Sequence, residues 1–139
     1  MVAMLTRLMP NITGPRSSKQ RILMSVANSI FFYGAEVWAD ALKVKCRRNR
    51  LLKVQYKGAL RVACAYRLVS VPAVLVIAGC IQVDLQAAER KRIYEAKIEG
   101  ADRNIYSMER STTPQKWQQK WREETRGRWT ARLIGEVQP

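Results

Sequence analysis

Residues 44–66 have the sequence VKCRRNRLLKVQYKGALRVACAY, and this stretch decides the fold class. Its apolar residues and its basic residues both recur mostly at steps of three and four, which is the spacing of an α-helix. At about 100° per residue the two sets fall on opposite faces of that helix. The stretch therefore predicts a helix with one face for a core and one continuous cationic face. The core face comprises Leu52, Tyr56, Ala59, Val62, Ala63 and Tyr66, and the cationic face comprises Arg47, Arg50, Lys53, Lys57 and Arg61.

A second amphipathic pattern precedes this stretch. Residues 1–10 predict a short helical lead-in, and residues 10–15, which contain two prolines and a glycine, predict a loop. Ser17 and Gln20 then have the spacing of a capping box, in which the serine hydroxyl accepts from the third helical amide. We expect the helix that follows to end or bend near Gly34 and to bury Ile22, Leu23, Val26, Ala27, Ile30 and Tyr33.

Three further helices are predicted downstream. Residues 70–79 predict a short apolar helix, with serine as its cap, proline in its first turn and glycine at its end, although a buried strand is the competing interpretation. Asp84 is expected to cap a long helix, and the Thr-Pro pair at residues 113–114 is expected to begin the last one. The apolar stripe of the long helix comprises Ala87, Tyr94, Ile98, Ala101 and Ile105.

These patterns predict an all-α fold. We expect a bundle of four to five helices over residues 1–109, which carries the cationic face. Residues 110–139, rich in tryptophan and arginine, are expected to form a C-terminal helical appendage or linker.

The residue types exclude several kinds of active site. The chain of 139 residues has no histidine, which removes nucleophile pairs, general bases and metal sites that depend on histidine. Its three widely spaced cysteines are too few for a zinc site of four thiolates and are expected to be reduced. Glu36 and Asp40 lie one helical turn apart and either hold a metal or, as we expect, pair with Lys43 or cap a helix end. No catalytic residue, metal ligand or cofactor is expected in this chain.

The charge of the chain is strongly uneven. Lys and Arg total 25 against 11 acidic residues, which gives a net charge of +14. Between Asp40 and Asp84 there is no acidic residue, while nine Lys or Arg fall there. Solvated helical faces normally mix both signs, so this stretch favours contact with a phosphate backbone over an ordinary solvated face. Because the cationic face carries no aromatic residue, duplex backbone is a better ligand for it than stacked single strand.

Three tryptophans near the C-terminus leave two interpretations open. Trp117, Trp121 and Trp129 lie among basic residues. They are candidates for stacking on bases or on arginine side chains. The favoured interpretation is that these large rings anchor the last helix to the bundle.

No segment predicts contact with a membrane. The longest uncharged run, residues 68–83, is too short and too interrupted to span a bilayer. Arg7 and Pro10 interrupt the apolar N-terminus, so a secretory signal is not expected. We therefore expect an intracellular protein.

Several stretches of the sequence resemble a known family. These are LMPNITGPRSSKQRILMSVANSIFFYGAEVWADAL (8–42), ALRVACAYRLVS (59–70), AVLVIAGCIQVDLQAAERKRIY (73–94) and WQQKWREETRGRWTARLI (117–134). They resemble the region that follows the polymerase core in the reverse transcriptases of non-LTR retrotransposons, and most of all the type-1 insect ribosomal-DNA group. The resemblance covers nearly the whole chain, and YGAEVWADAL and LRVACAYR are its most specific strings.

The resemblance implies a helical thumb that grips a primer–template duplex through its backbone. The cationic face would contact the RNA–DNA hybrid or the RNA template, with Arg16, Lys19 and Arg21 as a second contact. The parent polyprotein resembles an endonuclease joined to an RNA-directed DNA polymerase, which would act in the nucleus, require Mg²⁺ and supply the missing palm as a partner. The family's Tyr-x-Asp-Asp motif and its downstream Cys-His cluster have no counterpart here.

Those departures indicate a fragment of a longer polyprotein or a decayed reading frame, inactive by itself as an enzyme. Two alternatives remain open. One is a stand-alone basic adaptor that binds nucleic acid, and the other is a structural bundle whose Trp117 and Trp121 face docks a partner protein.

Overall fold

The computed structural model describes residues 16–100 and 104–138. The all-α prediction is confirmed, because the described part of the chain is 76% helical and contains no strand. The expected lead-in helix and loop of residues 1–15 lie outside the described residues. The helices are α2 (Ser17–Phe31), α3 (Ala35–Trp38), the 3-10 helix η1 (Ala39–Lys43), α4 (Lys45–Val62), α5 (Val71–Ala78), α6 (Val83–Ile98), α7 (Asn104–Glu123) and α8 (Arg128–Leu133).

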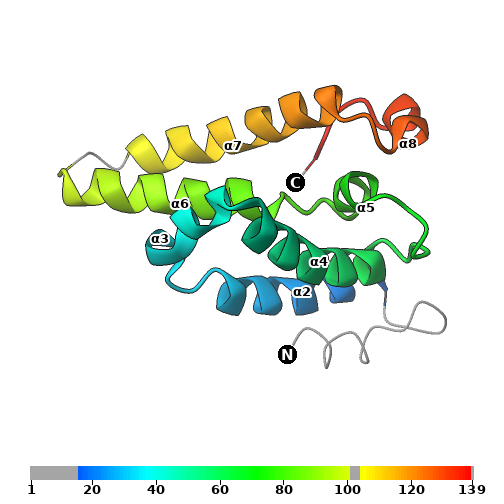
Figure 1. The fold of residues 1–139 in the computed structure, drawn as a ribbon, viewed down its shortest axis with the longest axis horizontal. Helices are drawn as coiled ribbons and strands as arrows, with labels where there is room; N and C mark the ends of the chain where they lie inside the picture. The colour runs from blue at the N-terminus through cyan, green and yellow to red at the C-terminus, as the bar shows by residue number, and fades with distance from the viewer. Residues whose placement is uncertain (1–15, 101–103, 139) are drawn as a thin grey trace.

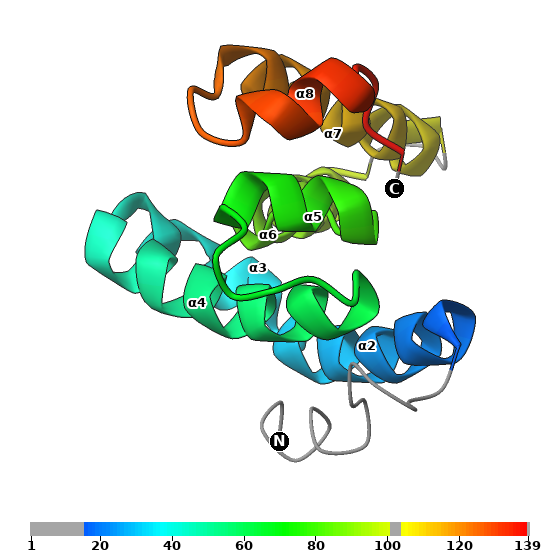
Figure 2. The ribbon, with the colours of Figure 1, turned by 90° about the vertical axis from the view of Figure 1, so that its right-hand side faces the viewer.

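The helices are stacked in layers. Seen from one end of the molecule, α2, α4, α5 and the α7–α8 pair follow one another from bottom to top (Figure 2). In Figure 1, α6 and α7 form an antiparallel pair along the upper side, and α2 lies along the lower side. Among the described residues, five α-helices have eight residues or more, in agreement with the expected bundle.

Local sequence signals set both ends of α5. Its first turn contains Pro72, and the chain leaves it at Gly79, whose φ of 65° favours a residue without a Cβ. Six of its eight residues are buried, so this apolar segment crosses the core as a helix and not as the alternative strand. Ser70 occupies the N-cap position, although its side chain makes no capping hydrogen bond.

Three clusters of buried apolar side chains hold the layers together. The first, which includes Met24 and Leu60, joins α2, α4 and α5. The second, which includes Phe32 and Val83, joins the segment from α2 to η1 with α6. The third places Trp117 of α7 against α5. The core is therefore continuous from α2 to α7.

A buried amide links α4 to the beginning of α6. Gln55 Nε2 donates to the carbonyl oxygen of Ile81 at 2.7 Å, and its Oε1 accepts from the amide of Val83 at 3.0 Å. Val83 is the first residue of α6, and its amide has no partner within that helix. The prediction that Asp84 caps this helix is wrong, because Asp84 lies inside α6 and a side chain from α4 satisfies the first amide.

α2 buries Ala27 as predicted, but most of its packing uses a different face from the predicted one. Its buried residues are Gln20, Met24 and Ala27, which face α4 and α5. Gly58 of α4 makes room for Met24, since a Cβ at this glycine would lie 2.5 Å from the methionine Sδ. α2 is apolar on more than one side, and its contact with α4 selects the side that carries Met24. Four residues of the predicted core face are exposed instead: Ile22, Val26, Ile30 and Tyr33.

The predicted capping box at the start of α2 is also wrong. The helix begins at Ser17 with Arg16 in the N-cap position, so Ser17 is already inside the helix. The Gln20 side chain does not reach back, because it is only 1% exposed and its Oε1 lies 3.8 Å from the sulfur of Cys64, just beyond α4.

The predicted ends of the other helices need correction. α4 ends at Val62, and Cys64 takes a left-handed φ of 49°, so Tyr66 leaves the predicted core face and is 82% exposed. The long helix predicted from residue 84 ends at Ile98, before Gly100 with its φ of 76°.

The last long helix begins earlier than predicted. α7 begins at Asn104, includes Ile105, and continues through Pro114, where a helix start was predicted. The expected boundary between residues 109 and 110 therefore falls inside one helix. Ala101, which was placed on the stripe of the preceding helix, lies outside the described residues.

Candidate nucleic-acid interface

The α4 cationic face, defined as Arg47, Arg50, Lys53, Lys57 and Arg61, follows the outer side of α4. All of these side chains are exposed except that of Arg61, which is half-buried. The opposite side of the helix enters the core through Gln55, Ala59 and Val62. The spacing of three and four residues separates the two sides, because successive side chains turn by about 100° around the helix.

The exposed part of this face has no acidic partner in the part of the chain that the structure describes. Among the described residues, no carboxylate lies within ion-pair distance of Arg47, Arg50, Lys53 or Lys57. α4 also has no acidic residue in its first turn. The charges of these four side chains therefore form no ion pair within the described residues and are available to a ligand.

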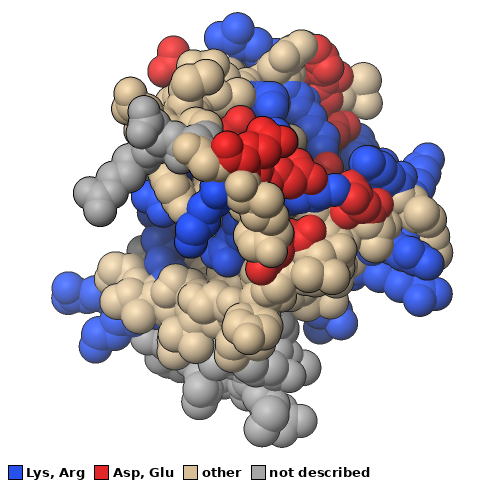
Figure 3. Space-filling model, turned by 90° about the vertical axis from the view of Figure 1, so that its left-hand side faces the viewer, with Lys and Arg blue, Asp and Glu red and all other residues tan. Residues whose placement is uncertain are grey.

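Several cations of α6 and α7 have acidic partners. Arg92 of α6 meets Glu109 of α7 at 2.6 Å, and Lys120 of α7 meets Asp84 of α6 at 2.8 Å. Figure 3 shows the end of the molecule where α3 and the tips of α6 and α7 lie, with acidic and basic side chains side by side. The α6–α7 pair thus has the mixed charge of an ordinary solvated surface, which the α4 cationic face lacks.

Asp40 is held by two lysines. Lys43 lies 3.0 Å from one carboxylate oxygen, and Lys91 contacts the other. These hydrogen bonds lower the pKa of Asp40 and raise the pKa of Lys91. Of the alternatives given for Glu36 and Asp40, the structure contains the pairing with Lys43, and Asp40 makes it. Within residues 16–100 and 104–138, no group of three acidic, cysteine or histidine side chains is arranged to hold a metal ion.

The second predicted contact lies beside the end of α4. Arg16, Lys19 and Arg21 are exposed at the beginning of α2. Gln20, between them, accepts a hydrogen bond from Cys64 just beyond α4, which places these residues at the same end as the last turn of the α4 cationic face. The Arg21 guanidinium also approaches Gly79 at the end of α5.

The three tryptophans separate into two groups. Trp117 and Trp121 are buried against α5, at 2% and 4% exposure. Both rings pack in the core of the chain, as the anchoring interpretation expects, and their burial leaves little of either ring open to a base or to a partner. Trp129 on α8 is 78% exposed and is accessible to a ligand.

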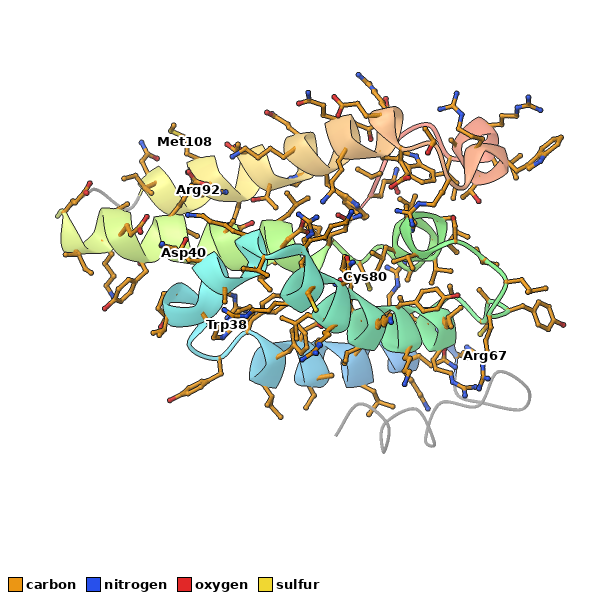
Figure 4. All side chains as sticks on the ribbon, viewed as in Figure 1. Trp38, Asp40, Arg67, Cys80, Arg92 and Met108 are labelled. Atoms are coloured by element: carbon orange, nitrogen blue, oxygen red, sulfur yellow. The ribbon has the colours of Figure 1, made fainter. Side chains whose placement is uncertain are left out.

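Sequence reasoning did not include Arg67 among the candidate contact residues. It lies in the connection after α4, at the end of the molecule opposite Asp40 and Arg92 (Figure 4). The Tyr56 hydroxyl donates to the carbonyl oxygens of Arg67 and Val69 at 2.7 and 2.9 Å, which fixes this connection against α4. Arg67 extends the positive charge beyond the last turn of α4, and its place in the acid-free stretch was the signal that could have found it.

No single helix among the described residues is both long and apolar enough to cross a membrane. Two bent helix pairs, Ser18–Phe31 with Ala35–Lys43 and Val71–Ala78 with Val83–Ile98, reach the required length and composition together.

Comparisons of the chain with protein-family models, with curated proteins and with solved structures found no match.

Proposed function

We propose that this chain binds duplex nucleic acid through its backbone, with the α4 cationic face along the phosphates. The observation that carries the proposal is a row of exposed basic side chains over about three helical turns, with no acidic partner in the described chain for Arg47, Arg50, Lys53 or Lys57. The row from Arg47 to Arg61 is about 21 Å long at ~1.5 Å per residue. Since phosphates follow one strand about every 3.4 Å of helix axis, this length is enough for several of them.

Contact with the backbone, and not with bases, is the proposed mode. Lys and Arg that follow phosphates position a duplex without reading its sequence. The α4 cationic face has no aromatic side chain on which a base could stack, and Tyr56 of α4 donates its hydroxyl to the backbone on the core side. Arg16, Lys19 and Arg67 would extend the same contact at the end of α4.

The resemblance to non-LTR retrotransposon reverse transcriptases supports a specific setting for this binding. In that setting the chain is the thumb of an RNA-directed DNA polymerase, and its duplex is the RNA–DNA hybrid of primer and template. The Mg²⁺ of such a polymerase belongs to the palm carboxylates, whose motif this sequence lacks. This chain would hold the duplex, whereas nucleotidyl transfer and any endonuclease activity would belong to the rest of the parent polyprotein.

A salt series with a charge-reversal variant tests the proposal. Binding of a fluorescent RNA–DNA hybrid duplex is measured by anisotropy for the natural chain and for the triple variant Arg50→Glu, Lys53→Glu, Lys57→Glu. Each lost phosphate contact should reduce by about 0.9 the steepness with which the logarithm of the binding constant falls with the logarithm of the salt concentration. The slope of the variant should therefore be less steep by roughly 2–3, and the variant should bind every duplex sequence more weakly.

A matched control separates this face from net charge alone. The triple variant Lys97→Glu, Arg110→Glu, Lys116→Glu changes the charge equally, at exposed sites on α6 and α7. It should retain most of the affinity and the salt slope. Equal losses in both variants, or an affinity that does not change between low and physiological salt, would contradict the proposal.

A further inference from the structure

α8 is a short helix that is held firmly in place although only Ala131 of its apolar side chains packs against the core. None of its described residues is buried. The chain enters it through Gly127, where an added Cβ would lie 2.9 Å from both the Ala73 Cβ and the Ser70 Oγ of α5. This close approach, together with a φ of 79°, fixes the turn before α8 against α5.

The segment after α8 is fixed to α7 by three hydrogen bonds. Trp121 Nε1 donates to the carbonyl oxygen of Ile134 at 3.0 Å. Gln118 donates to the carbonyl oxygen of Gly135 at 2.8 Å and accepts from the amide of Val137 at 2.7 Å. A helix that is anchored at both ends, with Ala131 against the core and its other long side chains exposed, presents those side chains to a ligand in a set geometry.

A basic hollow of about 330 Å³ lies between α7 and α8. Arg122, Arg128 and Arg132 line it, with Trp121 and Gly135 among the remaining wall residues. No acidic residue lines the hollow, and none of the three arginines has an ion-pair partner among the described residues. The nearby Arg126 differs, because Glu124 binds its guanidinium at 3.1 Å. The hollow is large enough for a nucleotide, and its charge favours phosphate.

Arg132 connects this hollow to an exposed aromatic ring. Its guanidinium carbon lies 4.5 Å from the centre of the Trp129 ring, while it also lines the hollow. This cation–π contact orients the indole, which is nevertheless 78% exposed. An oriented and exposed indole next to unpaired arginines combines the two groups that bind an unpaired nucleotide, a stacking surface and a phosphate site.

We infer that α8 binds an unpaired stretch of nucleic acid, with a base on Trp129 and phosphates in the hollow lined by Arg122, Arg128 and Arg132. The inference rests on the proposed function, because the unpaired strand continues from a duplex held on α4. Figure 2 shows the end of the molecule where α8 and the last turns of α4 lie on either side of α5. The two surfaces together would recognise a junction between duplex and single strand.

The test compares a blunt RNA–DNA hybrid with the same hybrid carrying an oligothymidine overhang. The natural chain should bind the overhang form about 5- to 150-fold more tightly, the range expected from one stacked base. Trp129→Ala should abolish this gain and leave binding of the blunt hybrid unchanged. Arg128→Ala should reduce the gain most at low salt, because it removes a phosphate contact.

Leu133→Ala provides the matched control, since this side chain is also exposed on α8 but carries no charge and no ring. It should retain the full gain. Thermal unfolding of all three variants should match the natural chain, because none of these residues is buried. No gain from the overhang, or a gain that survives Trp129→Ala, overturns the inference while binding of the blunt hybrid stands. Failure to bind the blunt hybrid, with a gain that still depends on Trp129, overturns the proposed function and leaves the α8 site supported.

Discussion

α2 and α4 pack against each other, yet their outer faces have opposite chemistry. The outer face of α4 is basic, whereas residues 22–35, which include most of α2, contain no charge at all. Ile22 and Val26 are exposed there, and the hydroxyls of Ser25 and Ser29 turn back to donate to backbone oxygens at 2.7 and 3.0 Å. The exposed face of α4 is therefore positively charged, whereas the exposed face of α2 over residues 22–35 is mainly apolar and carries no charge.

This difference in chemistry explains why the periodic pattern predicted the exposed side of α4 correctly but not that of α2. Turning α4 over would bury several Lys and Arg side chains, and each unpaired charge would cost several kcal/mol. Turning α2 over would exchange one apolar set for another, at about 1.5–3 kcal/mol for each side chain gained or lost. Charge therefore decides the orientation of α4, while α2 depends on the fit of its neighbours.

The largest expected effect tests the buried side of α2. Met24→Ala should lower the free energy of unfolding by about 2–5 kcal/mol, because it leaves a cavity between α2 and α4. Ile22→Ala, on the exposed side, should change it by about 0.5 kcal/mol or less. Urea unfolding followed by circular dichroism gives both values. A larger loss from Ile22→Ala than from Met24→Ala would mean that the two faces of α2 have been exchanged.

A smaller effect is expected where α2 and α4 approach most closely. Alanine normally stabilises the interior of a helix by about 1 kcal/mol over glycine. At Gly58 the new Cβ would meet the Met24 sulfur, so Gly58→Ala should lose this gain or destabilise the protein. In a Met24→Ala background the same change should stabilise it. A double-mutant cycle from urea unfolding should give a coupling of about 1–2 kcal/mol, and simple additivity would show that the contact is absent.

The smallest expected effect is a dependence on pH at a paired site, in contrast with the unpaired α4 cationic face. Hydrogen bonds from Lys91 and Lys43 lower the pKa of Asp40 below its ordinary value of 3.8. The stability contributed by this carboxylate is therefore present above pH 3.8 and is lost as the pH falls through the folded-state pKa. Asp40→Asn should make the unfolding free energy less dependent on pH in this acidic range. An identical pH profile for both proteins would exclude the contribution.

Sequence reasoning succeeded where a few neighbouring residues carry the signal. The Pro72 and Gly79 signals placed both ends of α5 correctly, because each residue restricts or permits particular backbone angles by itself. The outward side of α4 was also correct as far as its exposed basic residues show. The Thr113–Pro114 signal failed, since α7 continues through the proline while Trp117 packs against α5.

The candidate site was predicted in part for the same reason. The residues of the α4 cationic face follow from spacing, but nothing in the spacing of the tryptophans separates Trp121 from Trp129. Trp121 fills a space beside α5 and donates to Ile134, whereas Trp129 remains outside with Arg132 over its ring. The basic hollow next to Trp129 forms because α8 and the segment after it fold back on α7.

The sequence by itself determined the all-α class, the limits of α5 and the side of α4 that meets water. Each of these depends on backbone preferences or on the desolvation of charge, which act over a few residues. Only the tertiary structure decided which face of α2 is buried, that Gln55 caps α6, and which tryptophan stays exposed. Those outcomes depend on contacts between residues distant in the chain, where volumes and hydrogen-bond partners must match in space.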